Sequence, residues 1–227
     1  MATHLDFEEQ EQIDQLKAFW KQYGNLITWV LILALGGFAA WNGWQYWQRD
    51  QAAKAGLLFD EIAKAVDAGN TEQVGRLFGD MKERYAGTAY AQQGGLLAAK
   101  LQADKGQADA ARATLTWVGE NAAEPEYKTV ARLRLAGLLL DEKKYDDAAK
   151  ALDGATAAGF EGLVADRRGD VLLAQGKADD AKAAYQQSFK ALDATLDYRK
   201  LVEAKLTALG AAPAADAAAS AAKDGAK

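Results

Sequence analysis

The sequence contains no cysteine and a single histidine, His4. The absence of cysteine excludes disulfide bonds and thiolate metal sites. It does not identify the cellular compartment, because reducing and oxidising locations both tolerate cysteine-free domains. With one histidine near the N-terminus, the usual pairings of a general base with a nucleophile are missing. We therefore expect no enzymatic activity, no cofactor and no metal site.

Convincing strands are also missing, so no glycine-rich phosphate loop can follow one. The acidic pairs Asp146/Asp147 and Asp179/Asp180 fall at equivalent places, each at the expected start of a helix. Carboxylates at a helix N-terminus complement the helix dipole. Their recurrence at the same structural position favours this capping role over metal binding or acid–base catalysis.

Positive charge is neither in excess nor clustered along the chain. There are 27 Lys and Arg against 32 Asp and Glu, which gives a net charge of -5. Nucleic-acid binding needs a concentrated basic face, and none is present. We therefore expect no nucleic-acid partner.

One segment lacks charge altogether, over about 27 residues from Gln22 to Gln48. A helix of this length rises roughly 40 Å, enough to cross the ~30 Å hydrocarbon layer of a bilayer. Five of the six tryptophans lie between positions 20 and 47, as expected for rings that prefer the two headgroup levels. The segment predicts a single transmembrane helix over residues 24–48, in contact with membrane lipid.

A cleaved signal peptide is the alternative interpretation, since small residues at Gly37 and Ala39 precede a cleavage point after Ala39. The preceding segment is long and acidic, whereas a signal n-region is short and basic, so retention is favoured. Residues 1–23 have apolar side chains at helical spacing and predict an amphipathic segment, with a merely solvated helix as the alternative. The basic residues on the two sides of the span are nearly balanced, so charge alone does not orient it.

Small side chains form a stripe within the span, at Gly36, Ala40 and Gly43. Small residues at this spacing let a second helix approach closely in lipid. The stripe predicts packing against a transmembrane partner or a second copy of the chain in a homodimer. The alternative is that glycine and alanine are simply common in spans.

The rest of the chain repeats a turn followed by two polar residues and a small one. The turns are at Gly69, Gly106, Lys143 and Gly176, in steps of about 37, 37 and 33 residues. Each turn lies between two stretches of helical periodicity, and after the third turn this periodicity continues through Ala155. The spacing resembles the tetratricopeptide repeat. We therefore expect an all-α fold, in which three to five stacked helical hairpins over residues 49–209 form a solenoid.

Small residues recur at fixed distances from the turns, where two helices of a hairpin need close backbone approach. Ala136 and Gly169 lie seven residues before their turns, and Ala148 and Ala181 lie five residues after. The first two repeats match less well, with larger residues at two such places, Ile62 and Val74.

The sequence also marks where one of the inner helices begins and where the repeat region ends. Pro125 suits the first turn of a helix, because its missing N–H would be unpaired there anyway. The stretch Thr195–Leu209 predicts a terminal helix that covers the last hairpin. Residues 210–227 predict a disordered, alanine-rich tail, since they lack side chains able to build a core.

A solenoid of hairpins has a concave face that accepts peptides or a helix of a partner. Candidate partner-binding residues lie on the first helices of the repeats, and solvated surface charge is the alternative for each of them. They are Tyr90, Gln93, Lys100, Arg132, Arg134 and Arg168.

The segment Glu8–Gly24, the end of the span at Trp41-Asn42-Gly43-Trp44-Gln45 and the repeats together resemble the YfgM family, the ancillary subunit of the bacterial SecYEG channel. The resemblance implies a single-pass inner-membrane protein with a cytoplasmic N-terminus and a periplasmic repeat domain. It also implies association with the SecYEG translocon, with a PpiD-type periplasmic folding factor and with unfolded exported polypeptides. It carries over no catalytic residue.

Two functions of different kinds remain open at this point. The first is a translocon-associated, protein-binding subunit that assists the periplasmic chaperones receiving newly exported proteins. The second is a structural scaffold of another bacterial envelope complex, with one fixed partner in its concave face. A receptor that faces the cytosol is a third alternative.

Overall fold

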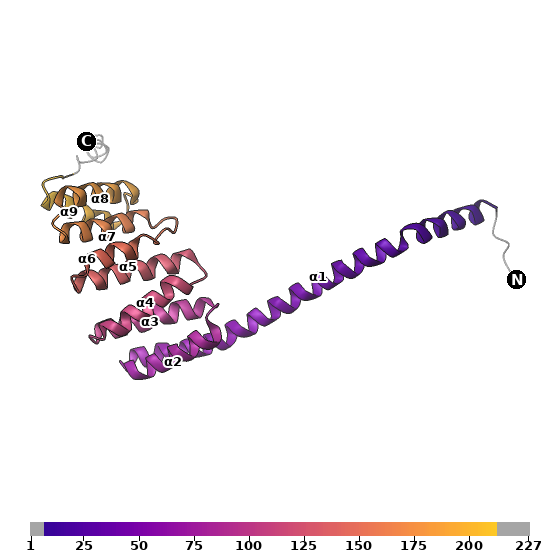
Figure 1. The fold of residues 1–227 in the computed structure, drawn as a ribbon, viewed down its shortest axis with the longest axis horizontal. Coiled ribbons are helices and arrows are strands. Elements are labelled where there is room, and N and C mark those ends of the chain that lie inside the picture. The colour runs from indigo at the N-terminus through magenta and orange to yellow at the C-terminus, as the bar shows by residue number, and fades with distance from the viewer. Residues whose placement is uncertain (1–6, 213–227) are drawn as a thin grey trace, which may run out of the picture. The chain divides into compact units, whose positions relative to one another are not determined.

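The computed structural model describes residues 7–212 of the chain (Figure 1). His4 and residues 213–227 of the expected tail lie outside the described range. Within that range there are nine helices and no strand, which confirms the all-α prediction. The helices are α1 (Phe7–Asp67), α2 (Thr71–Tyr85), α3 (Ala89–Asp104), α4 (Ala108–Asn121), α5 (Pro125–Asp141), α6 (Tyr145–Leu152), α7 (Glu161–Ala174), α8 (Ala178–Ala191) and α9 (Asp197–Ala208).

Helix α1 runs for 61 residues, so the expected boundaries at 23/24 and 48/49 both fall inside one helix. By the contacts among its own residues, the chain divides into a first unit, Met1–Gln51, and a second unit, Ala52–Lys227. The first unit contributes most of α1. The second contains the end of α1 and the eight helices that follow it.

The first unit contains a candidate membrane span. Among the described residues, α1 is the one helix long and apolar enough to cross a membrane. The successive residues Val30, Leu31, Ile32 and Leu33 are all exposed although they point in different directions around the helix. A helix that is apolar on every side needs an apolar surrounding, and a bilayer supplies one.

Polar side chains near the apolar run bond to the backbone of their own helix. Thr28 Oγ1 donates to the Gly24 carbonyl at 2.7 Å, and Asn42 Nδ2 donates to the Phe38 carbonyl at 2.9 Å. In lipid no water can satisfy such groups, so these bonds lower the cost of placing the two side chains there.

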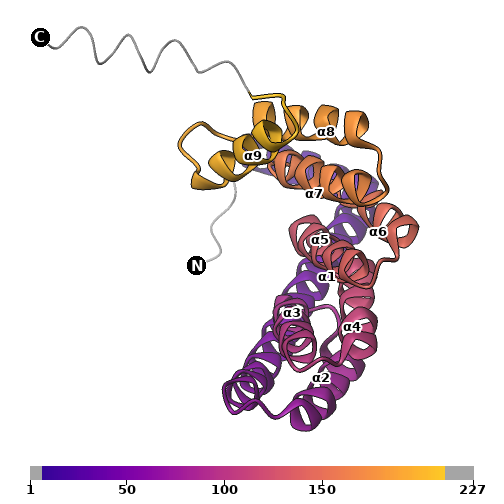
Figure 2. The same cartoon turned by 90° about the vertical axis from the view of Figure 1, so that its left-hand side faces the viewer.

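In its described residues, 52–212, the second unit forms four helical hairpins and a terminal helix. The end of α1 pairs with α2, then α3 with α4, α5 with α6 and α7 with α8. In this unit α3, α5 and α7 lie in one row while α4, α6 and α8 lie in the other (Figure 2). Successive first helices also touch, α3 with α5 and α5 with α7. This arrangement confirms the predicted stack of tetratricopeptide-like hairpins.

The four hairpin turns share one geometry. Gly69, Gly106, Lys143 and Gly176 have φ angles of 67, 73, 61 and 77°. The amide after each of these residues bonds to a carbonyl five positions earlier, at 2.8 to 2.9 Å. This is the Schellman motif, in which a left-handed residue ends the helix. The predicted turn positions are therefore the helix-ending residues themselves.

The predicted small residues lie where the helices cross. Ala136, Ala148 and Ala181 are fully buried, and a Cβ at Gly169 would overlap the ring of Tyr185. In these two repeats, a larger side chain at any of these places would prevent the close approach of the helices.

The first repeat also packs closely, but with larger residues at these two positions and a smaller residue on the neighbouring helix. Ile62 and Val74 are fully buried at positions where later repeats have small residues. The adjacent helix α3 provides Gly94, where an added Cβ would lie 3.3 Å from Ile62 Cδ1. The larger residue is thus accommodated by a missing side chain on the next helix.

Helix α6 is shorter than its sequence pattern predicts. It ends at Leu152, so Ala155 lies in the loop before α7, and the prediction of helix through Ala155 is wrong. The guanidinium of Arg132 occupies the space that a Cβ at Gly154 would need. The amide of Ala157 donates to Thr129 Oγ1 at 3.1 Å, which ties the loop to α5 in place of a further helical turn.

The terminal helix α9 is attached through a cluster of buried polar groups. Lys205 Nζ lies 2.8 Å from Asp166 Oδ1 and 2.6 Å from Asp170 Oδ1. Tyr198 donates to Asp166 at 2.6 Å and Tyr185 donates to Asp170 at 2.9 Å. Burial, followed by the hydrogen bond to a carboxylate, raises the pKa of both phenols well above the ordinary value. These contacts join α7, α8 and α9.

Candidate functional site

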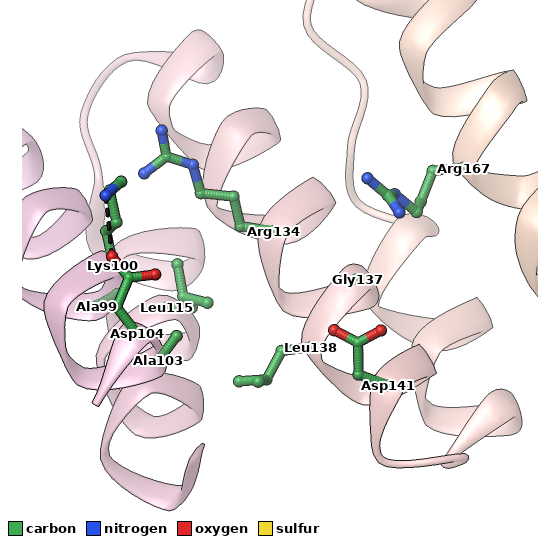
Figure 3. Close-up of a pocket in the computed structure, with 10 residues that line it drawn as sticks. All are labelled: Ala99, Lys100, Ala103, Asp104, Leu115, Arg134, Gly137, Leu138, Asp141 and Arg167. Atoms are coloured by element: carbon green, nitrogen blue, oxygen red, sulfur yellow. Dashed lines mark hydrogen bonds and ion pairs between the residues drawn. The ribbon is translucent and has the colours of Figure 1, made fainter. Parts of the chain in front are cut away.

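A groove of about 420 Å³ lies beside α3, α5 and α7, the first helices of three successive hairpins (Figure 3). Its volume is within the ~300–1,000 Å³ range of ligand-binding clefts. Side chains from three separate repeats reach it, so its shape depends on how the hairpins stack.

One wall of the groove is a face of α5. Arg134, Gly137, Leu138 and Asp141 line it, at relative positions 0, 3, 4 and 7. Residues with this spacing project from the same side of a helix. The wall therefore presents a cation, then a small and an apolar residue, then an anion.

The guanidinium of Arg134 is positioned by a bond across to α3. Its Nη1 donates to the carbonyl oxygen of Leu96 at 3.2 Å. No carboxylate among the described residues forms an ion pair with it. Its positive charge therefore faces the groove without a neutralising partner in the described part of the chain.

A second guanidinium comes from α7. Arg167 reaches toward Gly137, where an added Cβ would lie 3.6 Å from the Arg167 Cζ (Figure 3). Its Nη1 is 3.4 Å from Asp170 Oδ2, a long contact to a carboxylate that Lys205 and Tyr185 also hold. The glycine on α5 thus leaves room for a cation from the next repeat.

The opposite wall is nearly neutral. Lys100 Nζ and Asp104 Oδ2 form an ion pair on α3 at 2.9 Å. Ala99 and Ala103 lie on the same helix, and the nearly buried Leu115 of α4 lies beside them. Small and apolar groups therefore separate the charged ends of the groove.

The structure brings two of the six predicted partner-binding residues, Lys100 and Arg134, into this groove. The other four are not among its lining residues. Tyr90 stacks against Phe59, with ring centroids 5.7 Å apart. Gln93 Nε2 donates to the Tyr127 hydroxyl at 2.7 Å.

The remaining two arginines make contacts away from the groove. Arg132 Nε donates to the Gly119 carbonyl at 3.3 Å, and its guanidinium packs at Gly154. Arg168 Nη2 lies 3.8 Å from Asp153 Oδ1 at an exposed position. Arg132 thereby links the end of α4 to the loop after α6.

The groove residues that were not predicted as partner-binding include Gly137, Asp141 and Arg167. The seven-residue spacing from Arg134 to Asp141 was available and places both on one helical face. Arg167 could not be assigned in this way, because its place in the groove depends on the packing of α7 against α5.

The predicted stripe in the span is uncovered within the described residues. No heavy atom lies within 4 Å of a Cβ added at Gly36 or Gly43, and Ala40 is exposed. Among the described residues there is also no group of three or more acidic or histidine side chains that could hold a metal ion.

Comparison with known proteins places this chain in a family. Residues 17–211 match the tetratricopeptide repeat-like domain family. A protein of Neisseria gonorrhoeae named ancillary SecYEG translocon subunit is 32% identical over 210 residues, covering 92% of this chain and 100% of that protein. The chain belongs to the ancillary SecYEG translocon subunit family.

Two further members of the ancillary SecYEG translocon subunit family support the assignment. The Escherichia coli protein of that name is 28% identical over 204 residues, or 88% of this chain and 96% of the relative. The Haemophilus influenzae protein is 28% identical over 181 residues, or 80% of this chain and 88% of the relative. The resemblance to the YfgM family is thereby confirmed over most of the chain.

Proposed function

We propose that this chain is a membrane-anchored, protein-binding subunit associated with the SecYEG translocon, which assists the periplasmic chaperones that receive newly exported proteins. The observation that carries the proposal is the groove, which contains the unpaired charge of Arg134. The relatives of this chain are named as translocon subunits, which supports the place of action. The candidate span supplies an anchor in the same membrane as the channel. A stack of hairpins presents side chains from several repeats to one bound segment.

The proposal includes a topology, with a cytoplasmic N-terminus and a periplasmic repeat domain in the bacterial inner membrane. The family resemblance supports this orientation, since the balance of basic residues does not decide it. Protease added to intact spheroplasts should degrade the repeat domain without lysis. A repeat domain that is cut only after lysis would instead identify a receptor that faces the cytosol.

The proposed partners are the SecYEG translocon, a PpiD-type periplasmic folding factor and unfolded exported polypeptides. The exposed stripe at Gly36, Ala40 and Gly43 supports contact with a transmembrane helix, either of such a partner or of a second copy. The apolar face around the stripe would contact membrane lipid.

Site-specific photo-crosslinking during export tests the groove directly. A photoreactive residue in place of Lys100 or Arg134 should capture many different exported chains. The matched control is Arg76, an exposed residue of α2 that does not line the groove, and it should capture few. One repeated adduct at both groove positions would instead favour the structural scaffold of an envelope complex with a fixed partner.

A further inference from the structure

The unneutralised charges of the groove lie at a fixed separation on α5. Arg134 and Asp141 are seven residues apart, which at 1.5 Å per residue is roughly 10 Å along the helix axis. Among the described residues, neither side chain forms an ion pair, although both line the same groove. A ligand that neutralised both would need an anion and a cation about 10 Å apart.

The cationic end has unused hydrogen-bond donors. A guanidinium carries five N–H donors in a fixed fork, and Arg134 uses Nη1 for the Leu96 carbonyl. The fork geometry suits a carboxylate, which can accept two parallel bonds. Arg167 adds positive charge on the side of Gly137, where its own carboxylate contact is long at 3.4 Å.

The middle of the groove is lined by small and apolar residues. Between the charged ends the wall consists of Gly137 and Leu138, with Ala99 and Ala103 opposite. Alanine-sized groups can lie against these residues and bury apolar surface.

An unfolded polypeptide meets these requirements in one of its major extended conformations. In the polyproline II conformation the chain rises about 3.1 Å per residue with three residues per turn, so residues three apart project from the same side roughly 9 Å apart. That separation is close to the spacing of Arg134 and Asp141. The β conformation would place the same two side chains on opposite sides.

We propose that the groove recognises an extended segment of an unfolded polypeptide in which an acidic and a basic side chain lie three residues apart, with small apolar residues between them. The acidic group pairs with Arg134 and the basic group with Asp141. This inference rests on the proposed function, because it assumes that the groove receives polypeptide, and it adds the sequence pattern that the groove prefers.

The test uses the full-length chain in lipid nanodiscs and two fluorescein-labelled hexapeptides of one composition. In Gly-Glu-Ala-Ala-Lys-Gly the charges are three residues apart, and in Gly-Ala-Glu-Lys-Ala-Gly they are adjacent. Fluorescence anisotropy measures the two dissociation constants. Because one partly exposed ion pair is worth about two- to fivefold in affinity, the spaced peptide should bind about fivefold more tightly. The difference should shrink as salt is raised.

Charge-reversal variants assign the effect to named residues. Arg134→Glu and Asp141→Lys should each weaken binding of the spaced peptide by about tenfold, since each replaces an attraction with a repulsion. The double variant Arg134→Glu, Asp141→Arg should restore binding to within about threefold, because the peptide can lie in the opposite direction. Arg76→Glu, which makes the same charge change on α2 outside the groove, should leave binding unchanged.

The outcomes separate this inference from the proposed function. Equal affinities for the two peptides, no binding of either, or unchanged binding by Arg134→Glu would overturn the spacing preference. The crosslinking of exported chains at the groove would still stand in each case. Arg134 and Asp141 are both exposed, and a retained thermal transition in each variant would confirm that it is folded.

Discussion

Lys143 is the one non-glycine residue with a positive φ in the described part of the chain, at 61°. The other three hairpin turns have glycine at the equivalent place, where the absence of a Cβ removes the steric penalty of the left-handed conformation. The third turn therefore has a strained residue in a position that the other repeats fill without strain.

We predict that Lys143→Gly increases the free energy of unfolding of the repeat domain. The relief of strain is about 1–2 kcal/mol, and the greater flexibility of unfolded glycine offsets part of it, which leaves a gain of roughly 0.5–1 kcal/mol. Thermal unfolding followed by circular dichroism would measure this as a higher midpoint. The control Lys177→Gly, at a φ of -90°, should give no gain.

Neither atom of the Gln92 amide has a hydrogen-bond partner among the described residues, a condition it shares with the buried hydroxyl of Ser188. Its side chain is fully buried on α3. Burying an unpaired polar group costs about 1–3 kcal/mol. Gln102, by contrast, is nearly buried and accepts a bond from Thr114 Oγ1 at 2.9 Å.

This contrast gives a second prediction. Gln92→Met has a similar length without the unpaired amide, so it should stabilise the domain by about 1–2 kcal/mol. Gln102→Met should instead destabilise it by a similar amount, since Thr114 would lose its acceptor. Chemical denaturation of the two variants measures both changes. A loss of stability in Gln92→Met would mean that its amide has a partner, such as a buried water molecule.

At the scale of the elements, the attachment of α9 depends on charges that are paired away from water. Asp166 has only 1% of its side chain exposed, and Lys205 is its cationic partner. Removing one partner of a buried pair leaves an uncompensated charge, which costs about 3–5 kcal/mol. The cluster therefore makes the last helix sensitive to single substitutions.

We expect Lys205→Met to release α9 from the last hairpin before the remaining helices unfold. Hydrogen exchange of the α9 amides should become faster, while the amides of α3 and α4 keep their protection. Lys200→Met is the matched control on the same helix, because the Lys200–Asp197 pair is mostly exposed and contributes little. Unchanged exchange in Lys205→Met would show that apolar contacts alone hold α9.

The helical hairpins could be predicted from the sequence because their determinants are local. Glycine at 69, 106 and 176 signals a helix end by itself, and Pro125 lies in the first turn of α5 as its missing N–H suggests. The early end of α6 could not be predicted in this way. It depends on Arg132, which is distant in sequence from Gly154, and on the bond from Ala157 to Thr129.

The groove was predictable only in part, for the same reason. Lys100 and Arg134 could be chosen because they are charged and lie on first helices of the repeats. Arg167 enters the groove because Gly137, thirty residues earlier, leaves space on the neighbouring repeat. Such contacts between repeats depend on how the hairpins stack, and no short sequence pattern records them.

At the scale of the whole molecule, the chain joins a candidate membrane anchor to a stack of helical hairpins. The stripe at Gly36 and Gly43 has no covering atoms among the described residues, so a leucine at each place would protrude into whatever helix packs there. We predict that Gly36→Leu with Gly43→Leu reduces co-purification of the membrane partner several-fold, while the repeat domain keeps its thermal unfolding midpoint.

A matched control is available within the same span. Gly37 lies on a different side of the helix, also with no atom within 4 Å of an added Cβ, so Gly37→Leu should leave co-purification unchanged. Equal recovery of the partner with the stripe variant would indicate that these glycines do not contact another helix.

The hairpin turns also limit how this protein can change in length. The residue that follows each left-handed position is already the N-cap of the next helix, so an inserted residue would break the end of one helix and the start of another together. Insertions, tags and reporters should therefore be tolerated in the connections between hairpins, at exposed positions such as Ala158 and Gly159. Any growth of the chain among its relatives should concentrate there.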